Sequence, residues 1–281
     1  MPQRTATTAT TAELARAFVY FGGLTLLRYV VFVGLWAAVV AWLGGRMQWR
    51  PRLQAPGLAL KQWRRELTLS GATIVIAALI APAILWLGAG RQMPFYRNIA
   101  THGGWAYFVF SIVQMLFIRD TLFYWAHRAM HARALFRFTH RSHHLSTNPN
   151  PLTSYSVSPV ESLFDTVVPF VLILFLVPKH PAAYLIFLWI DSAVAVYGHM
   201  GMEIFPRGTS RHWFGRFINT PTAHNWHHAS ARHNYGFYFL VWDRLMGTMD
   251  PDYDRRFEAA TARPARALGH PAAAYSDARS K

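Results

Sequence analysis

Long uninterrupted runs of apolar residues dominate the chain and alternate with two polar segments that are rich in histidine. The apolar runs at 18–43, 67–87 and 105–125 are each long enough to cross a bilayer core of about 30 Å as a helix. A further apolar block at 163–196 is broken by the segment PKHP at 178–181, which leaves halves of about 15 residues, short for a full span. We expect these halves to form a tilted or partly buried helical hairpin.

The pattern predicts an all-α integral membrane protein with about four membrane helices under a cytosolic, histidine-rich helical cap. These helices are two spans, a third span and the hairpin, and the polar segments of the cap come between and after them. The expected order along the chain is a disordered tail, a membrane region with a basic loop, a catalytic region that includes the hairpin, and a second disordered tail. Their limits are 1–17, 18–125, 126–258 and 259–281.

Composition agrees with a membrane protein, since 53% of the residues are hydrophobic and only 15% are charged. The formal net charge is nevertheless +15, and six of the basic residues follow the first span. They are Arg46, Arg50, Arg52, Lys61, Arg64 and Arg65. A basic loop beside a span is typical of the cytoplasmic side. Both histidine-rich segments then fall on that side and can meet in one cap. Nucleic acid is not an expected partner, because the charge flanks the membrane spans and no nucleic-acid motif accompanies it.

The chain has no cysteine, which excludes disulfides, iron–sulfur clusters, thiolate zinc sites and cysteine nucleophiles. It has 14 histidines, and eight of them form three short clusters. The clusters are HRAMH (His127 and His131), HRSHH (His140, His143 and His144) and HNWHH (His224, His227 and His228).

On a helix, residues three and four apart share one face, so a pair at i and i+4 can present two imidazoles to one metal ion. A trio at i, i+3 and i+4 can place two rings on one ion and the third on a neighbouring ion. Eight nitrogen ligands are too many for one tetrahedral zinc and suit two metal ions, for which iron, zinc and copper are all candidates. One such cluster alone is commonly just a basic helix end, but three clusters on one side of the membrane predict metal binding.

The three clusters and their flanking text resemble the sterol desaturase and fatty acid hydroxylase family of membrane di-iron enzymes. The flanking segments are SPVESLFD, GHMGMEIFP and HNYGFYFLVWDRLMGT. The resemblance implies that the eight clustered histidines bind two iron ions, which zinc can replace in a purified sample, and that His199 is a ninth ligand. It also implies oxidation of a membrane lipid with O2 and electrons from a separate carrier protein. No catalytic group beyond the metal centre is expected.

Four further residues are candidates for an extra ligand or for a partner that orients a ligand: Glu203, His233, Asp120 and Asp243. For Asp243, structural support of the cap is the favoured role. Two other acids, Asp165 and Asp191, are expected to bond histidine N–H groups, because an unpaired acid in hydrocarbon is costly.

Hydroxylation and desaturation remain equally open, because the same clusters serve both. The flanking text slightly favours a sterol or other isoprenoid substrate over acyl or alkyl chains. Alternatives from another class are a membrane metal transporter or metal-binding protein, although a transporter should hold its ligands at mid-bilayer. Abundant Ala and Arg, with no dilysine at the C-terminus, favour a bacterial inner membrane over the endoplasmic reticulum, with the histidines facing the cytoplasm.

Overall fold

The computed structural model describes residues 9–43, 53, 60–87, 93–147 and 149–262. Within these ranges five helices are long and apolar enough to cross a membrane, and no strand is present beyond two isolated bridges. The five are α1 (Thr11–Leu43), α2 (Leu60–Leu87), α3 (Gly104–Met130), the continuous helix formed by α5 (Pro159–Ser162), η3 (Leu163–Val167) and α6 (Val168–Leu176), and α7 (Pro181–Gly198). The predicted all-α membrane fold is confirmed.

The two halves of the hairpin are longer than the sequence pattern predicted, because the first helix begins before its apolar run and the second extends beyond its run at both ends. Ser158 accepts a hydrogen bond from the Glu161 amide at 3.1 Å, so the helix begins at Pro159, before the apolar run. The His180 side chain accepts one from the Ala182 amide in the same way at the start of α7. Each half is therefore 18 residues long, enough for a full span.

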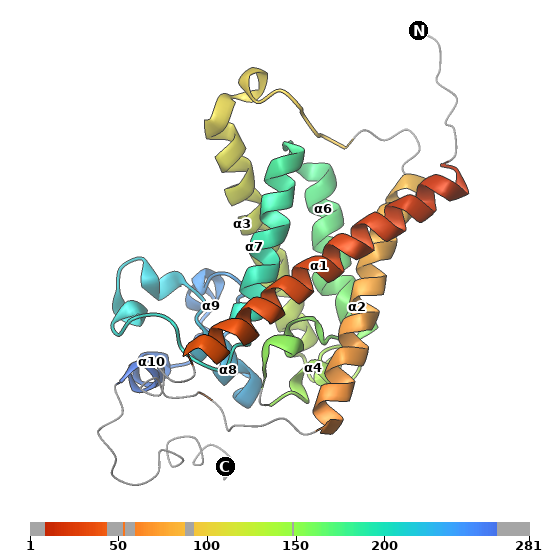
Figure 1. The fold of residues 1–281 in the computed structure, drawn as a ribbon. Coiled ribbons are helices and arrows are strands. Elements are labelled where there is room, and N and C mark those ends of the chain that lie inside the picture. Colours follow the sequence, from red (N-terminus) through yellow and green to blue (C-terminus); the bar gives the residue numbers. More distant parts are fainter. Residues whose placement is uncertain (1–8, 44–52, 54–59, 88–92, 148, 263–281) are drawn as a thin grey trace.

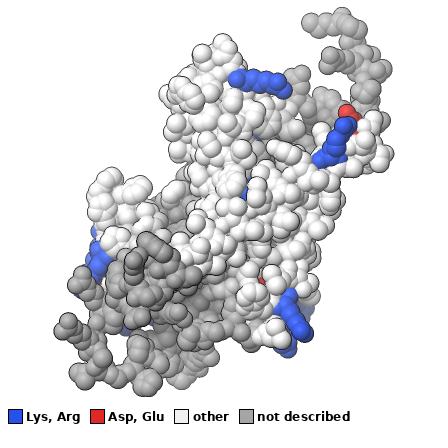
Figure 2. All heavy atoms as spheres, viewed as in Figure 1, with Lys and Arg blue, Asp and Glu red and all other residues white. Residues whose placement is uncertain are grey.

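Three of the membrane helices, α3, α6 and α7, stand side by side, and α1 and α2 cross against them (Figure 1). Their core is a cluster of large apolar side chains that includes Phe108, Met115, Phe170, Ile173 and Phe187. On the face shown in Figure 2 basic side chains gather toward the two ends, and the surface between is almost free of charge. Such a belt is what a bilayer core requires.

The cap is formed by residues 131–158 and 199–262 and lies at one end of the helices (Figure 1). Its short helices are α4 (Arg141–His144), η2 (Pro151–Tyr155), η4 (Thr209–Arg211), η5 (Gly215–Phe217), α8 (Pro221–Ser230), α9 (Val241–Leu245) and α10 (Tyr253–Thr261). A small apolar core of Ala223, Leu240, Tyr253 and Phe257 holds α8 against α10.

Both predicted tails are partly helical in the described residues. Helix α1 begins at Thr11, so residues 11–17 continue the first span, and α10 extends through residues 259–261. The remaining predicted tail residues, apart from 9, 10 and 262, lie outside the described residues. So do three residues of the basic loop: Arg46, Arg50 and Arg52. Arg65 bonds the Ser146 hydroxyl at 2.8 Å, which puts the start of α2 against the cap, next to the second histidine cluster.

Candidate metal centre

The three clusters come from three elements that end or begin at the cap. His127 lies on the last turn of α3 and His131 is its C-terminal cap, four residues later. The second cluster lies on α4 and the residue before it. The third lies on α8, whose start is fixed by Pro221 and by Thr220, which accepts a hydrogen bond from the Ala223 amide. His199 is the C-terminal cap of α7.

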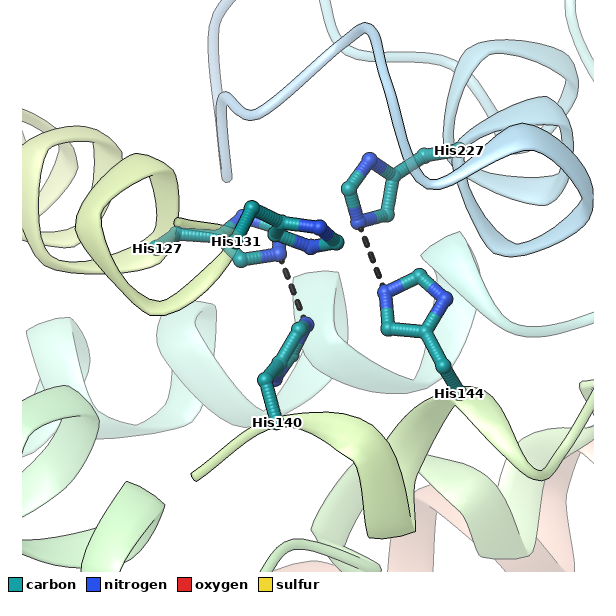
Figure 3. A group of neighbouring side chains, drawn as sticks. All are labelled: His127, His131, His140, His144 and His227. Carbon is teal, nitrogen blue, oxygen red and sulfur yellow. Dashed lines mark hydrogen bonds between the residues drawn. The ribbon is translucent and has the colours of Figure 1, made fainter. Parts of the chain in front are cut away.

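Nine histidines form two groups in which the ring nitrogens lie within 4.8 Å of one another. The first group is His127, His131, His140, His144 and His227 (Figure 3), and the second is His143, His199, His224 and His228. These are the nine histidines that the sequence and the family resemblance singled out. In both trios the i, i+4 pair falls in one group and the middle histidine in the other, because adjacent side chains on a helix point about 100° apart.

The spacing of the nitrogens fits a shared ion in each group. In the first group Nε2 of His127 lies 2.9 Å from that of His140, and those of His144 and His227 are 3.1 Å apart, as Figure 3 shows. In the second group the corresponding distances range from 2.9 to 3.4 Å. Two imidazole nitrogens bound to one ion at about 2.1 Å, with an angle of about 90–110°, lie about 3.0–3.4 Å apart.

The protonation state of His143 and His199 also supports a shared metal ion in the second group. Nδ1 of His143 donates to the Ser156 carbonyl at 3.1 Å, and Nδ1 of His199 donates to the Ala195 carbonyl at 2.6 Å. Burial lowers the pKa of these imidazoles to about 4 and about 3, so each is neutral and carries its only proton on Nδ1. Their Nε2 lone pairs therefore face each other at 3.4 Å, an arrangement that a cation between them stabilises.

Burial keeps the other cap histidines neutral too, as a metal ligand must be. It lowers the pKa of His131 to about 4, and the pKa values of five more histidines fall well below the usual 6.5 for the same reason, helped by repulsion between neighbouring rings. These are His140, His144, His224, His227 and His228. Imidazole nitrogens of this kind suit iron, zinc and copper, and five of them exceed a tetrahedral zinc site.

Glu161 is a functional candidate that the sequence analysis missed. Its carboxylate accepts a hydrogen bond from Nδ1 of His140 at 2.5 Å, and both side chains are almost fully buried, 2% and 3% exposed. The bond leaves Nε2 of His140 free to face that of His127, whose Nδ1 donates to the Tyr235 carbonyl at 2.9 Å. An acid placed three residues after a helix-starting Ser158-Pro159, just before an apolar run, was the available signal.

Glu203 and His233 are not members of either nitrogen group. The Glu203 carboxylate is fully buried and accepts hydrogen bonds from the Thr222 amide and hydroxyl, at 3.0 and 2.7 Å, at the start of α8. It thus stabilises the helix that carries the third cluster, with its negative charge at the helix N-terminus. His233 contributes its backbone carbonyl, which accepts from Nδ1 of His227 at 2.7 Å.

Asp120 and Asp243 both bind the loop after the third cluster rather than an imidazole. Asp243 accepts from the Tyr235 and Gly236 amides, each at 2.8 Å, which is the structural support expected of it. Asp120 accepts from the amides of residues 237–239, the shortest at 2.7 Å from Tyr238. Because the Tyr235 carbonyl in this loop accepts from His127, both acids act on the histidines only through the backbone.

The prediction that Asp165 and Asp191 bond histidines is wrong, because both aspartates form ion pairs with an arginine instead. Arg119 makes an ion pair with each at 3.2 Å, and Tyr238 donates to Asp191 at 2.6 Å. A π-helical turn over η3 carries Asp165 at this point of the helix. The ion pairs keep these three charged side chains from being isolated within the membrane helices, where an isolated charge would be costly, although Nη1 of Arg119 has no partner among the described residues.

A cavity of about 530 Å³ lies on the membrane side of the cap, between α1, α2, α6 and α7. Its far end is apolar, and rim residues such as Phe21 and Leu85 are exposed on the membrane surface. Its cap end includes Tyr155 and Val157, which flank the Ser156 carbonyl that bonds His143. The cavity therefore extends from exposed residues of the membrane helices to the two neighbours of Ser156, and none of the grouped histidines is among its lining residues.

Comparisons with known proteins agree with this site. The fatty acid hydroxylase family model matches residues 112–248, which contain all nine grouped histidines. Lathosterol oxidase of Rattus norvegicus is 32% identical over 197 residues, 70% of this chain and 64% of that protein. A Delta(7)-sterol 5(6)-desaturase of Gibberella zeae is 27% identical over 238 residues, 84% of this chain and 66% of that protein.

A more distant relative is a very-long-chain aldehyde decarbonylase of Oryza sativa, 26% identical over 70% of this chain and 31% of that protein. The chain spans slightly less than two thirds of the length of the sterol-oxidising relatives it matches. No solved structure matches it significantly. The resemblance drawn from the histidine clusters is confirmed.

Proposed function

We propose that this chain, which belongs to the sterol desaturase and fatty acid hydroxylase family, hydroxylates or desaturates a membrane lipid with O2. The observation that carries the proposal is the pair of buried histidine groups, of five and four rings, in a cap whose residues also line one end of a cavity in the membrane region. Two iron ions bound by these groups would supply the activation of O2 that breaking an unreactive C–H bond requires.

The protein's own contribution is to orient the imidazole rings and to exclude bulk water from the site. Backbone carbonyls and Glu161 hold the Nδ1 atoms of His127, His140, His143 and His199, so the Nε2 atoms point inward without reorganisation. All four rings are at most 5% exposed, which excludes bulk water from the reacting atoms.

A sterol or other isoprenoid lipid is the proposed substrate, slightly favoured over an acyl or alkyl chain. The names of two relatives, lathosterol oxidase and Delta(7)-sterol 5(6)-desaturase, support this preference. The volume of about 530 Å³ lies in the range of about 300–1,000 Å³ typical of small-molecule sites, and most of the lining is apolar.

The proposed electron donor is a separate carrier protein that meets the cap from the cytoplasm. The basic residues Lys61, Arg64 and Arg65 begin α2 beside the cap, and the positive-inside rule assigns that end to the cytoplasmic face. An excess of basic residues favours an acidic carrier and anionic lipid. The proposed location is a bacterial inner membrane.

The test is lipid mass spectrometry on iron-supplied cells that express the wild type, His143→Ala or His102→Ala. His102 is exposed on η1 (Ala100–His102) before α3, so its variant controls for loss of a histidine as such. We expect a product from the wild type and His102→Ala, but not from His143→Ala. One added oxygen would identify a hydroxylase, and a loss of two hydrogens a desaturase. Identical lipids in all three strains, with an electron-transfer system supplied, would contradict the proposal. Metal uptake into vesicles without O2 consumption would favour the transporter alternative.

A further inference from the structure

The charged side chains of the cavity lie at one end, and that end is the one beside the cap. Four charged side chains line it: Arg28, Arg119, Asp165 and Asp191. Hydroxyl groups of Thr25, Thr73, Ser154 and Tyr155 lie in the same lining. The far part is lined by apolar side chains of α1, α2 and α7, such as Ile80, Ile84 and Leu185.

Arg28 lies at the cap end, although it belongs to the first membrane helix. The next residue, Tyr29, donates to the Leu152 carbonyl of η2 at 3.5 Å and packs on Tyr155, with ring centroids 4.9 Å apart. This turn of α1 is therefore held against the cap. Tyr155 in turn is next to Ser156, whose carbonyl accepts from Nδ1 of His143.

Arg28 is buried but unpaired, unlike the other arginine of the cavity. Its side chain is 7% exposed, and among the described residues its one hydrogen bond is to the Thr25 hydroxyl at 3.3 Å and its Nε has no partner. Arg119 instead makes ion pairs with both aspartates. Among the described residues no acid pairs with Arg28. A guanidinium in a membrane cavity with unused N–H donors is costly, and a ligand that accepts hydrogen bonds would remove that cost.

The charges of the cavity indicate what kind of ligand this is. Two arginines and two aspartates line the cap end, so their formal charges cancel. An anionic ligand would add a charge that nothing in the cavity balances, whereas an alcohol or ketone supplies the missing acceptor without adding charge.

We propose that Arg28 binds the oxygen of a neutral lipid, an alcohol or a ketone, and that the hydrocarbon part of this lipid extends toward the apolar end of the cavity. This inference deepens the proposed function and rests on it for the identification of the ligand as the substrate. The oxygen-bearing end then lies nearest the histidines, and the tail points away from them.

The test is equilibrium binding to the metal-loaded full-length protein in phosphatidylcholine nanodiscs, without O2. The probes are cholesterol, cholestenone, cholestane and, for a linear ligand, octadecanol, octadecane and stearate. We expect the wild type to bind the alcohol or ketone of one series about tenfold or more tightly than the matching hydrocarbon, since hydrogen bonds to a charged donor are strong. Stearate should bind no better than octadecanol.

The variant Arg28→Met removes the guanidinium but keeps an unbranched, flexible side chain, and it should reduce that preference to within about twofold, while Arg28→Lys should retain part of it. Arg16→Met is the matched control, because Arg16 is exposed on the same helix, and it should bind like the wild type. Stronger binding of stearate, an unchanged preference in Arg28→Met, or no binding of any oxygenated probe by the wild type would overturn the inference. Arg28-dependent binding without any lipid oxidation in cells would overturn only the proposed oxidase activity, and oxidation with Arg28-independent binding would overturn only this inference.

Discussion

The hydrogen bond between Glu161 and His140 gives the sharpest test of the two-group site. The bond is 2.5 Å long and both side chains are almost fully buried, so removal of the carboxylate leaves Nδ1 of His140 without its protein acceptor. Loss of a partner that orients a metal-binding imidazole typically lowers metal affinity about 10–100-fold, which corresponds to about 1.4–2.8 kcal/mol. Because His140 belongs to the group of five, Glu161→Ala should weaken the ion held there and leave the ion of the other group unchanged.

The assay is release of iron into a graded series of chelator concentrations, followed as iron per chain by mass spectrometry. The wild type should retain two ions per chain, and Glu161→Ala should release one of them at about 10–100-fold lower chelator. Glu161→Gln keeps an oxygen acceptor without the charge and should fall between them. The control is Glu258→Ala, since Glu258 pairs with the exposed Arg207 at the cap surface. A release curve like that of the wild type, or equal weakening of both ions in a folded protein, would refute the reasoning.

Three other predictions concern metal content, pH and the membrane ion pairs. His131→Ala and His143→Ala alter different groups, so each should lower the metal content by about one ion per chain and together by two, as elemental analysis would show. The folded pKa values of these two histidines are about 4, below the 6.5 of an exposed ring, so the unfolded chain takes up protons first. The metal-free protein should keep its stability above about pH 6.5 and lose it toward pH 4, by up to about 1.4 kcal/mol per pH unit for each histidine. A melting temperature that stays constant across this range would contradict the burial of these two histidines as neutral rings. Arg119→Met leaves two partly buried aspartates without their cation and should cost up to about 3 kcal/mol, measured as a lower melting temperature in detergent. A melting temperature equal to that of the wild type would exclude a structural role for the pairs.

The sequence determined the membrane helices and the eight clustered histidines, because both are local patterns, whereas the isolated His199 was predicted only from the family resemblance. A run of apolar residues must form a helix in hydrocarbon wherever it lies in the fold, since its backbone has no other hydrogen-bond partners there. The spacing of the clusters placed pairs such as His140 and His144 on one helix face, and it set the intervening His143 to point elsewhere. In the structure His140 and His144 lie in one group and His143 lies in the other, as their directions on the helix predict.

The partners of the buried acids were decided only by the tertiary structure. Asp120 binds amides more than a hundred residues further along the chain, and Asp165 and Asp191 meet on Arg119 from two other helices. Glu161 reaches His140 across the cap–membrane boundary, and its neighbouring sequence marks only a helix start, not this partner. A buried carboxylate must find a donor, but the sequence does not specify which donor the packing of distant helices brings within about 3 Å. For the same reason, the position of Arg28 beside the cap end of the cavity is apparent only once the helices are packed.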